Sequence, residues 1–167
     1  SAASDVYKET VFMDSGEKGR KDDGRYATFT DSQVAWYEWL VEGTNADAGK
    51  NVKSMAFFHI PLIQYAQAAD AVGLDKSTGL EEGVYSSKRD SGIFDSMKRL
   101  GSTVATFCGH DHQNTFAVDY EGVKLCYGGS AGYTTYGRVG LKCVRVIDLD
   151  VYGEEFSTEI LFEKELD

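Results

Sequence analysis

The three histidines of this chain stand at positions from which they could bind a metal ion. His110 and His112 stand one residue apart behind Gly109, and His59 precedes an Ile-Pro pair. Each follows the apolar end of a stretch with strand character. Imidazole is the commonest neutral metal ligand, and the end of a strand holds it rigidly. The pattern therefore favours a metal site, although a histidine that simply satisfies a turn would explain any one of the three by itself.

Three neutral nitrogens could not hold a dinuclear centre alone, because hard divalent and trivalent ions need carboxylate oxygens as well. Asp14 and Asp111 are the carboxylates nearest to the strand ends. Asp14 is more simply a turn residue, and Asp111 is more simply an exposed loop residue or the partner of a histidine. Neither is assigned as a metal ligand from the sequence.

Strands and helices are expected to alternate ahead of the histidines. Apolar patterning predicts strands over 6–13, 54–59 and 102–108, and helices over 34–41, 63–72 and 91–100. A capping box at Thr30 begins the first helix and Gly43 is expected to end it. The stretches 15–25 and 73–89 are predicted to be surface loops.

After the histidine loop the pattern changes to alternating strands. They are expected over 115–120, 123–127, 141–149 and 157–163, with Glu121-Gly122 as a hairpin turn. The element order predicts an α/β (α+β) domain with a mixed sheet, flanking helices and a C-terminal β-meander.

Composition narrows the class of protein. The 167 residues are enough for one domain, expected to span 1–167. A net charge of −10 argues against a nucleic-acid partner, and no apolar run approaches the length of a membrane span. A soluble protein with no membrane partner is expected, and its compartment is left open. The three cysteines are predicted to be buried free thiols: Cys108, Cys126 and Cys143.

Several stretches together resemble the C-terminal half of the calcineurin-like metallophosphoesterases, and most closely their purple-acid-phosphatase-related branch. The likeness runs over most of the chain. It is carried by residues 57–62 (FFHIPL), 108–114 (CGHDHQN), 125–129 (LCYGG) and 136–138 (YGR), and by 12–16 (FMDSG) and 32–36 (SQVAW) before the first histidine.

The resemblance implies half of a four-layer αββα sandwich with two metal ions, iron, zinc or manganese, at the carboxyl ends of the strands. It implies that His59 and His110 share one metal and that His112 binds the other. The implied reaction is hydrolysis of a phosphoester by a metal-activated water. A phosphodiesterase of the same superfamily fits the sequence as well as a phosphatase.

The family's first motifs are not found in this chain. Asp-x-His, Gly-Asp-x-x-Asp and Gly-Asn-His, which supply the carboxylate and amide ligands, have no match. We therefore expect a C-terminal part whose N-terminal half is missing, with weak or no metal binding and little activity by itself. The expected partners are a phosphoester substrate, the missing half, and a second copy that covers exposed sheet. A non-catalytic scaffold or interaction domain is the alternative.

Two polar residues near the histidines are candidates for substrate binding. Arg138 lies in a glycine- and tyrosine-rich loop, and its planar guanidinium suits a phosphate. Asn114 follows the histidine pair directly. An exposed loop arginine and a turn-forming asparagine are the simpler explanations of the two.

Overall fold

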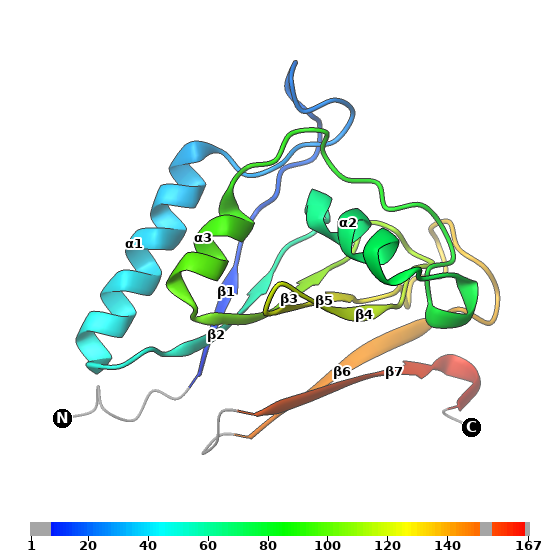
Figure 1. Cartoon of the computed structure of the whole chain (residues 1–167). Coiled ribbons are helices and arrows are strands. Elements are labelled where there is room, and N and C mark those ends of the chain that lie inside the picture. Colours follow the sequence, from blue (N-terminus) through cyan, green and yellow to red (C-terminus); the bar gives the residue numbers. More distant parts are fainter. Residues whose placement is uncertain (1–7, 151–154, 166–167) are drawn as a thin grey trace.

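A five-stranded mixed sheet forms the middle of the molecule (Figure 1). The computed structural model describes residues 8–150 and 155–165, so positions 6 and 7 of the first expected strand lie outside them. The strand order is β1-β2-β3-β5-β4; the first four of these run parallel, and β4 pairs antiparallel with β5. The strands are β1 (Lys8–Phe12), β2 (Lys53–Phe57), β3 (Thr103–Cys108), β4 (Ala117–Tyr120) and β5 (Val123–Tyr127).

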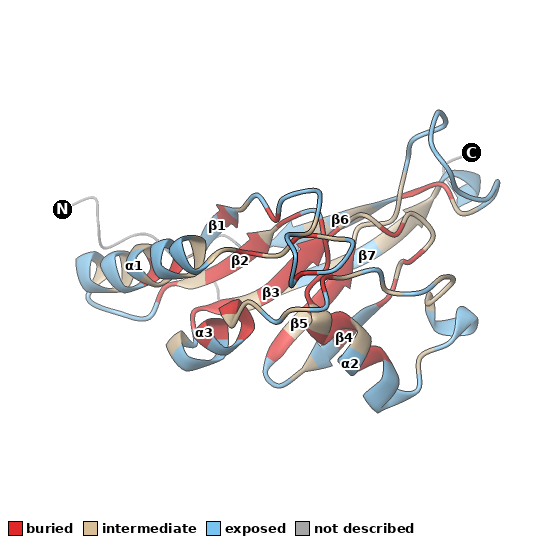
Figure 2. Ribbon diagram, turned by 90° about the horizontal axis from the view of Figure 1, so that it is seen from above, coloured by how far each residue is buried: buried red, intermediate tan, exposed pale blue. Residues whose placement is uncertain are grey.

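Three helices cover one face of this sheet (Figures 1 and 2). They are α1 (Asp31–Ala48), α2 (Ile63–Val72) and α3 (Ile93–Leu100). The main core lies between them and the sheet, with Tyr37, Tyr65 and Phe94 almost wholly buried in it. The mixed sheet with flanking helices that the sequence predicts is therefore confirmed.

The first helix is longer than the sequence predicts. Its capping box at Thr30 is confirmed, but the helix continues through the exposed Gly43 and ends at Gly49, whose φ is 65°. The side chain of Asn45 explains the extension, since it donates to Ser102 Oγ at 3.0 Å and accepts from the Val52 amide at 2.7 Å. These bonds hold the last turn against the sheet. They offset the loss of helix stability that a glycine inside a helix causes.

The other face of the sheet is covered by a hairpin of β6 (Cys143–Leu149) and β7 (Phe156–Phe162) (Figure 1). A second small core lies between the hairpin and the sheet, and it is built on Met55, Ala105 and Phe107. The expected C-terminal meander is thus divided, because β4 and β5 join the main sheet while β6 and β7 form their own. The layers are helices, sheet and hairpin.

The remaining elements are short. They are the 3-10 turns η2 (Lys76–Thr78), inside the expected loop 73–89, and η3 (Glu163–Glu165). All three cysteines are buried free thiols, as predicted. No helix in the part of the chain that the structure describes is both long and apolar enough to cross a membrane.

Candidate metal-binding histidine site

Parallel pairing brings the residues that follow β1, β2 and β3 to one edge of the sheet. Phe12 pairs with Phe57, and Phe57 pairs with Phe107, so the three strands finish level with one another. Asp14 and His59 each follow their strand's last residue by two positions, and His110 does the same after β3. The carboxyl edge of an open parallel sheet is where ligands usually bind.

His59 and His110 meet at this edge. His59 Nε2 and His110 Nδ1 are 3.3 Å apart, and the two rings stand at 87° to each other. Two imidazole nitrogens bound about 2.1 Å from one ion, at an angle of roughly 100°, would have this separation. The separation therefore matches that of two neighbouring ligands of one ion, and in this structure it also allows a hydrogen bond between the two rings.

The backbone beside the histidine pair has one unusual conformation, at His110. His110 itself, and not Gly109, has a positive φ, at 71°. A Cβ at Gly109 would lie 3.4 Å from His59 Nδ1, and the Gly109 amide donates to the His59 carbonyl at 3.1 Å. The first of these distances is an ordinary van der Waals contact, so the His59 ring packs beside residue 109 without requiring a glycine there.

His112 is held separately, against the loop of residues 128–140. Its ring stacks on Tyr136 with centroids 4.3 Å apart, and its Nδ1 lies 3.0 Å from the Tyr136 carbonyl oxygen. Its amide donates to the Tyr136 hydroxyl at 3.0 Å. The structure therefore brings two of the three histidines together and anchors the third to a tyrosine.

The two nearby aspartates form hydrogen bonds with neighbouring parts of the protein. Asp14 Oδ1 accepts from the Gly16 amide at 2.8 Å, which is the turn role expected of it. Asp111 is neither exposed nor bonded to a histidine: it is 1% exposed, and its Oδ2 accepts from the Tyr127 hydroxyl and from the Tyr85 amide. Burial raises the pKa of Asp111 to about 6.

The histidine pair has no third metal-binding side chain among the residues that the structure describes. Among residues 8–150 and 155–165 no group of three or more His, Cys, Asp and Glu side chains could hold a metal ion. Burial, followed by the neighbouring His59, His112 and Arg25, lowers the pKa of His110, which favours the neutral form that donates to a metal. Two imidazoles thus fit part of one ion's coordination shell and leave the rest to other donors.

The two candidate substrate residues are both engaged by the loop that contains Glu81. Arg138 is half exposed, and its Nη2 lies 3.0 Å from Glu81 Oε2. Asn114 is fully buried, and its Oδ1 accepts from the amides of Glu81 and Glu82 at 2.9 and 3.0 Å. In this structure the Asn114 side chain holds the loop in place and faces no open cavity.

Sequence reasoning missed the other wall of the site. A cavity of about 610 Å³ lies over the histidine pair, and the loop expected to be merely solvated forms its opposite side. Tyr26 packs edge-on against His110 with ring centroids 4.4 Å apart. The cavity lining consists of Glu17, Lys18, Arg25, Tyr26, His59, Ile60 and His110. The dense lysines and arginines of residues 18–25 were the available signal.

Known proteins similar to this chain carry phosphatase names. Probable inactive purple acid phosphatase 28 of Arabidopsis thaliana is 32% identical over 138 residues, which cover 81% of this chain. The homologues of this chain are purple-acid-phosphatase-like proteins. Phosphatase DCR2 of Saccharomyces cerevisiae is 33% identical over 108 residues, or 59% of this chain. No family model matches the chain.

The chain spans 34% of the length of the Arabidopsis relative and 18% of that of the yeast relative. Among solved structures, a dimetal phosphatase from Danio rerio is similar, with 13% identity and a TM-score of 0.44; the likeness covers 83% of this chain and 34% of that one.

Proposed function

We propose that this chain supplies the metal-binding histidines of a metal-dependent phosphoester hydrolase of the phosphatase type. The observation that carries the proposal is the meeting of His59 Nε2 and His110 Nδ1 at 3.3 Å, on the edge of a parallel sheet. Homology to purple-acid-phosphatase-like proteins supports the same reaction class.

Each histidine has a defined part in this proposal. His59 and His110 hold one ion between them, and His112 faces a second, oriented by its contact with Tyr136. Metal ions of this kind, iron, zinc or manganese, polarise a phosphoryl oxygen and lower the pKa of a bound water. The orientation of His112 is fixed by the Tyr136 carbonyl, because a ligand imidazole is usually held through its other nitrogen.

The chain by itself is proposed to be inactive. Two neutral nitrogens must compete with the hydration shell of the cation, and they neutralise none of its charge. Hard ions bind strongly where carboxylate oxygens are added. We propose that the remaining ligands come from a further part of the polypeptide, since this chain spans 34% of the length of the Arabidopsis relative and 18% of that of the yeast relative.

A second candidate function is a non-catalytic scaffold of the same fold. The observation that favours it is the description of the Arabidopsis relative as probably inactive, whereas the yeast relative is described as a phosphatase. The two candidates differ in whether a protein with the full ligand set turns over a substrate.

Turnover and metal content of the full-length protein test the proposal together. With p-nitrophenyl phosphate as substrate, His59→Ala and His110→Ala should each lower turnover by on the order of 100-fold and reduce bound metal, since even residues that merely orient ligands change activity 10- to 100-fold. Trp39→Ala, an exposed residue on α1, is the matched control. Metal-loaded protein without turnover would favour the scaffold, and turnover unaffected by both histidine substitutions would refute the histidine assignment.

A further inference from the structure

The loop that faces the histidine pair is folded, and we call residues 17–26 the basic arm. Lys18 and Tyr26 form an antiparallel bridge, and the Gly19 amide donates to the Arg25 carbonyl at 3.0 Å. A Cβ at Gly19 would lie 2.2 Å from the Gly24 carbonyl oxygen, so the two sides of the arm are packed closely enough to require glycine there. The arm is thus a small hairpin with a fixed outline.

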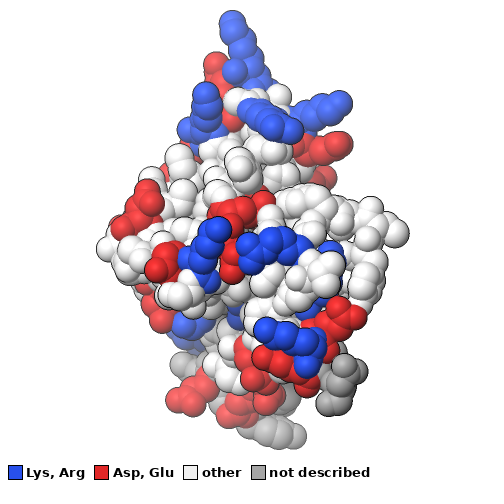
Figure 3. Space-filling view, turned by 90° about the vertical axis from the view of Figure 1, so that its right-hand side faces the viewer, with Lys and Arg blue, Asp and Glu red and all other residues white. Residues whose placement is uncertain are grey.

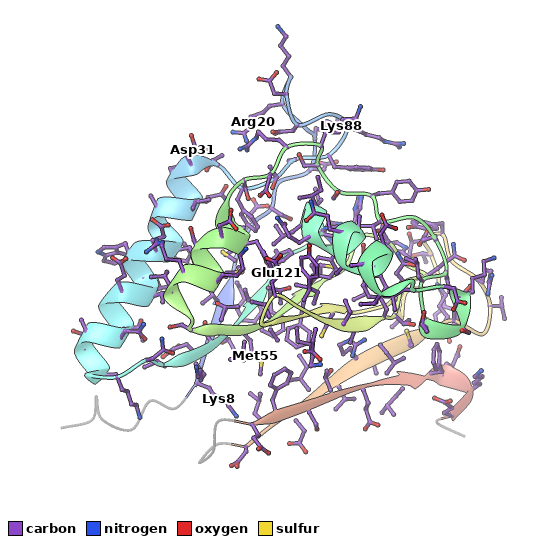
Figure 4. All side chains as sticks on the ribbon, viewed as in Figure 1. Lys8, Arg20, Asp31, Met55, Lys88 and Glu121 are labelled. Carbon is purple, nitrogen blue, oxygen red and sulfur yellow. The ribbon has the colours of Figure 1, made fainter. Side chains whose placement is uncertain are left out.

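The basic arm is also fastened to the body of the protein. Asp23, which is 1% exposed, pairs with Arg20 of the arm at 2.9 Å and with Arg89 at 2.6 Å. Its carbonyl accepts from the Lys88 amide at 2.8 Å. Arg20 and Lys88 lie at the same end of the molecule in Figure 4. The backbone of the arm is therefore held in place before any ligand arrives, which lowers the entropy cost of binding.

The basic arm gathers positive charge in an acidic protein. The chain has a net charge of −10, yet residues 17–25 hold four lysines and arginines against three carboxylates. Figure 3 shows lysine and arginine side chains clustered at the end where the arm projects. Arg20 forms an ion pair with Asp23. Lys18, Lys21 and Arg25 form no ion pair with the residues that the structure describes. Their charges are available to a ligand.

Two of these cations reach the histidine site. Lys18 and Arg25 line the same 610 Å³ cavity as His59 and His110, with Glu17 as the carboxylate among the lining residues. Lys21 is on the same arm and outside that lining. A cavity of this size is typical of small-molecule sites and has room for a phosphoryl group with an organic substituent.

We propose that Lys18 and Arg25 bind the anionic group of the ligand that occupies the cavity above His59 and His110. The Arg25 guanidinium can offer two parallel N–H donors to a tetrahedral oxyanion, and the Lys18 ammonium adds a point charge beside it. That this anion is a phosphoryl group rests on the proposed function. The binding of an anion by the basic arm does not depend on catalysis.

Titration of the chain with inorganic phosphate at constant ionic strength, followed by amide NMR, tests the inference. Phosphate should shift the amide signals of residues 17–26 together with those around His59 and His110. Lys18→Gln combined with Arg25→Gln should weaken binding about tenfold or more, because each removes a charge-assisted hydrogen bond. Each single substitution, Lys18→Gln or Arg25→Gln, should weaken binding more than Lys21→Gln, which removes one charge from the same arm and should weaken it about twofold or less, since an exposed charge outside the cavity is screened.

Two results would overturn the inference: an effect of Lys21→Gln as large as that of either single substitution, or phosphate shifts confined to other parts of the chain. Unchanged amide spectra away from the arm show that each variant is folded. Failure here is distinguishable from failure of the proposed function, since phosphate binding needs no turnover. If the full-length protein is inactive but the arm binds phosphate, the anion site is supported. If the protein is active but the arm binds no phosphate, the anion site is refuted.

Discussion

His110 holds a backbone conformation that few residues other than glycine adopt. Its φ of 71° places it in the left-handed region, where a Cβ is crowded by the backbone. The same conformation turns its Nδ1 towards His59 Nε2. Strain at a residue that lies in a candidate site is consistent with selection for position over stability.

Comparison of His110→Gly with His110→Ala isolates the backbone strain, because both variants lack the ring. The glycine variant should be more stable than the alanine variant by about 1 kcal/mol, the cost of one left-handed non-glycine residue. Urea unfolding of the two variants measures the difference. Equal stabilities would mean that the local backbone relaxes without cost.

At the scale of single residues, the sequence predicted the positions of the histidines better than their surroundings. The glycine and histidine pattern placed His59 and His110 at strand ends, where the structure has them. It could not place Tyr26, because a contact between residues 84 positions apart leaves no local pattern. It also misread Asp111, since nothing beside it in the chain shows that Tyr127 and Tyr85 enclose it.

At the scale of elements, α1 has one glycine inside it and another directly after its last residue, and the two positions need different backbone conformations. Gly43 lies exposed inside the helix, and Gly49 ends it with a φ of 65°. A Cβ at either position would meet no atom within 4 Å, so sterics with neighbours play no part. Backbone conformation alone distinguishes the two positions.

Gly43→Ala should raise the free energy of unfolding by about 1 kcal/mol, because alanine is the better helix former. Gly49→Ala should lower it by about 1 kcal/mol, because the left-handed conformation is strained for alanine. Thermal unfolding of the two variants beside the parent chain measures both signs. A stabilising effect at Gly49 would show that the helix does not end there.

Asp23 joins the basic arm to the loop before α3. Its side chain is buried between Arg20 and Arg89, and Arg89 also donates to the Phe29 carbonyl at 2.7 Å. The hydrogen bond from Arg20, followed by that from Arg89, lowers the pKa of Asp23. The stability this gives is present above the unfolded pKa of about 4 and is lost as the pH falls below it.

Asp23→Asn should lower the free energy of unfolding at pH 7 by about 2 kcal/mol, since it removes the charge that accepts from two guanidinium groups. It should also reduce the loss of stability below pH 4. Asp22→Asn is the matched control, because Asp22 is exposed and forms no ion pair among the described residues. Denaturant unfolding between pH 3 and pH 7 gives both quantities. Similar losses of unfolding free energy for the two variants would contradict the proposed role of Asp23.

Most elements of the fold were predictable because each has a local signal. The helix α2 agrees with the expected range 63–72, and the hairpin turn at Glu121-Gly122 has the positive φ values that such turns need. The predicted end of α1 was wrong, because Gly43 indicates a helix end that distant contacts of Asn45 override. The division of the last four strands between two sheets depends on packing against Met55 and Phe107, which no local pattern records.

At the scale of the whole molecule, apolar surface remains beside the edge strand β1. Phe12 is 73% exposed and stacks on Phe57, which in turn stacks on Phe107, each with centroids 4.9 Å apart. β1 is the outer strand on that side of the sheet. An exposed edge next to an aromatic row is a surface that favours association.

We expect this chain to self-associate through that edge as its concentration rises. Phe12→Ser should shift the distribution towards monomer, because it removes exposed apolar area at the edge. Trp39→Ser is the matched control, since Trp39 is 69% exposed on α1. Sedimentation velocity over a range of concentrations measures the effect. A parent chain that stays monomeric throughout would contradict the expectation.

The pairing of His59 with His110 on one ion is the claim on which the rest depends. Titration of this chain with Zn²⁺, followed by the ring nitrogen signals of the three histidines, tests it most directly. We predict that the signals of His59 and His110 shift together with one weak affinity, and that His59→Ala abolishes the response of His110. Separate responses of the two rings, or a response of His110 that survives the loss of His59, would contradict the account.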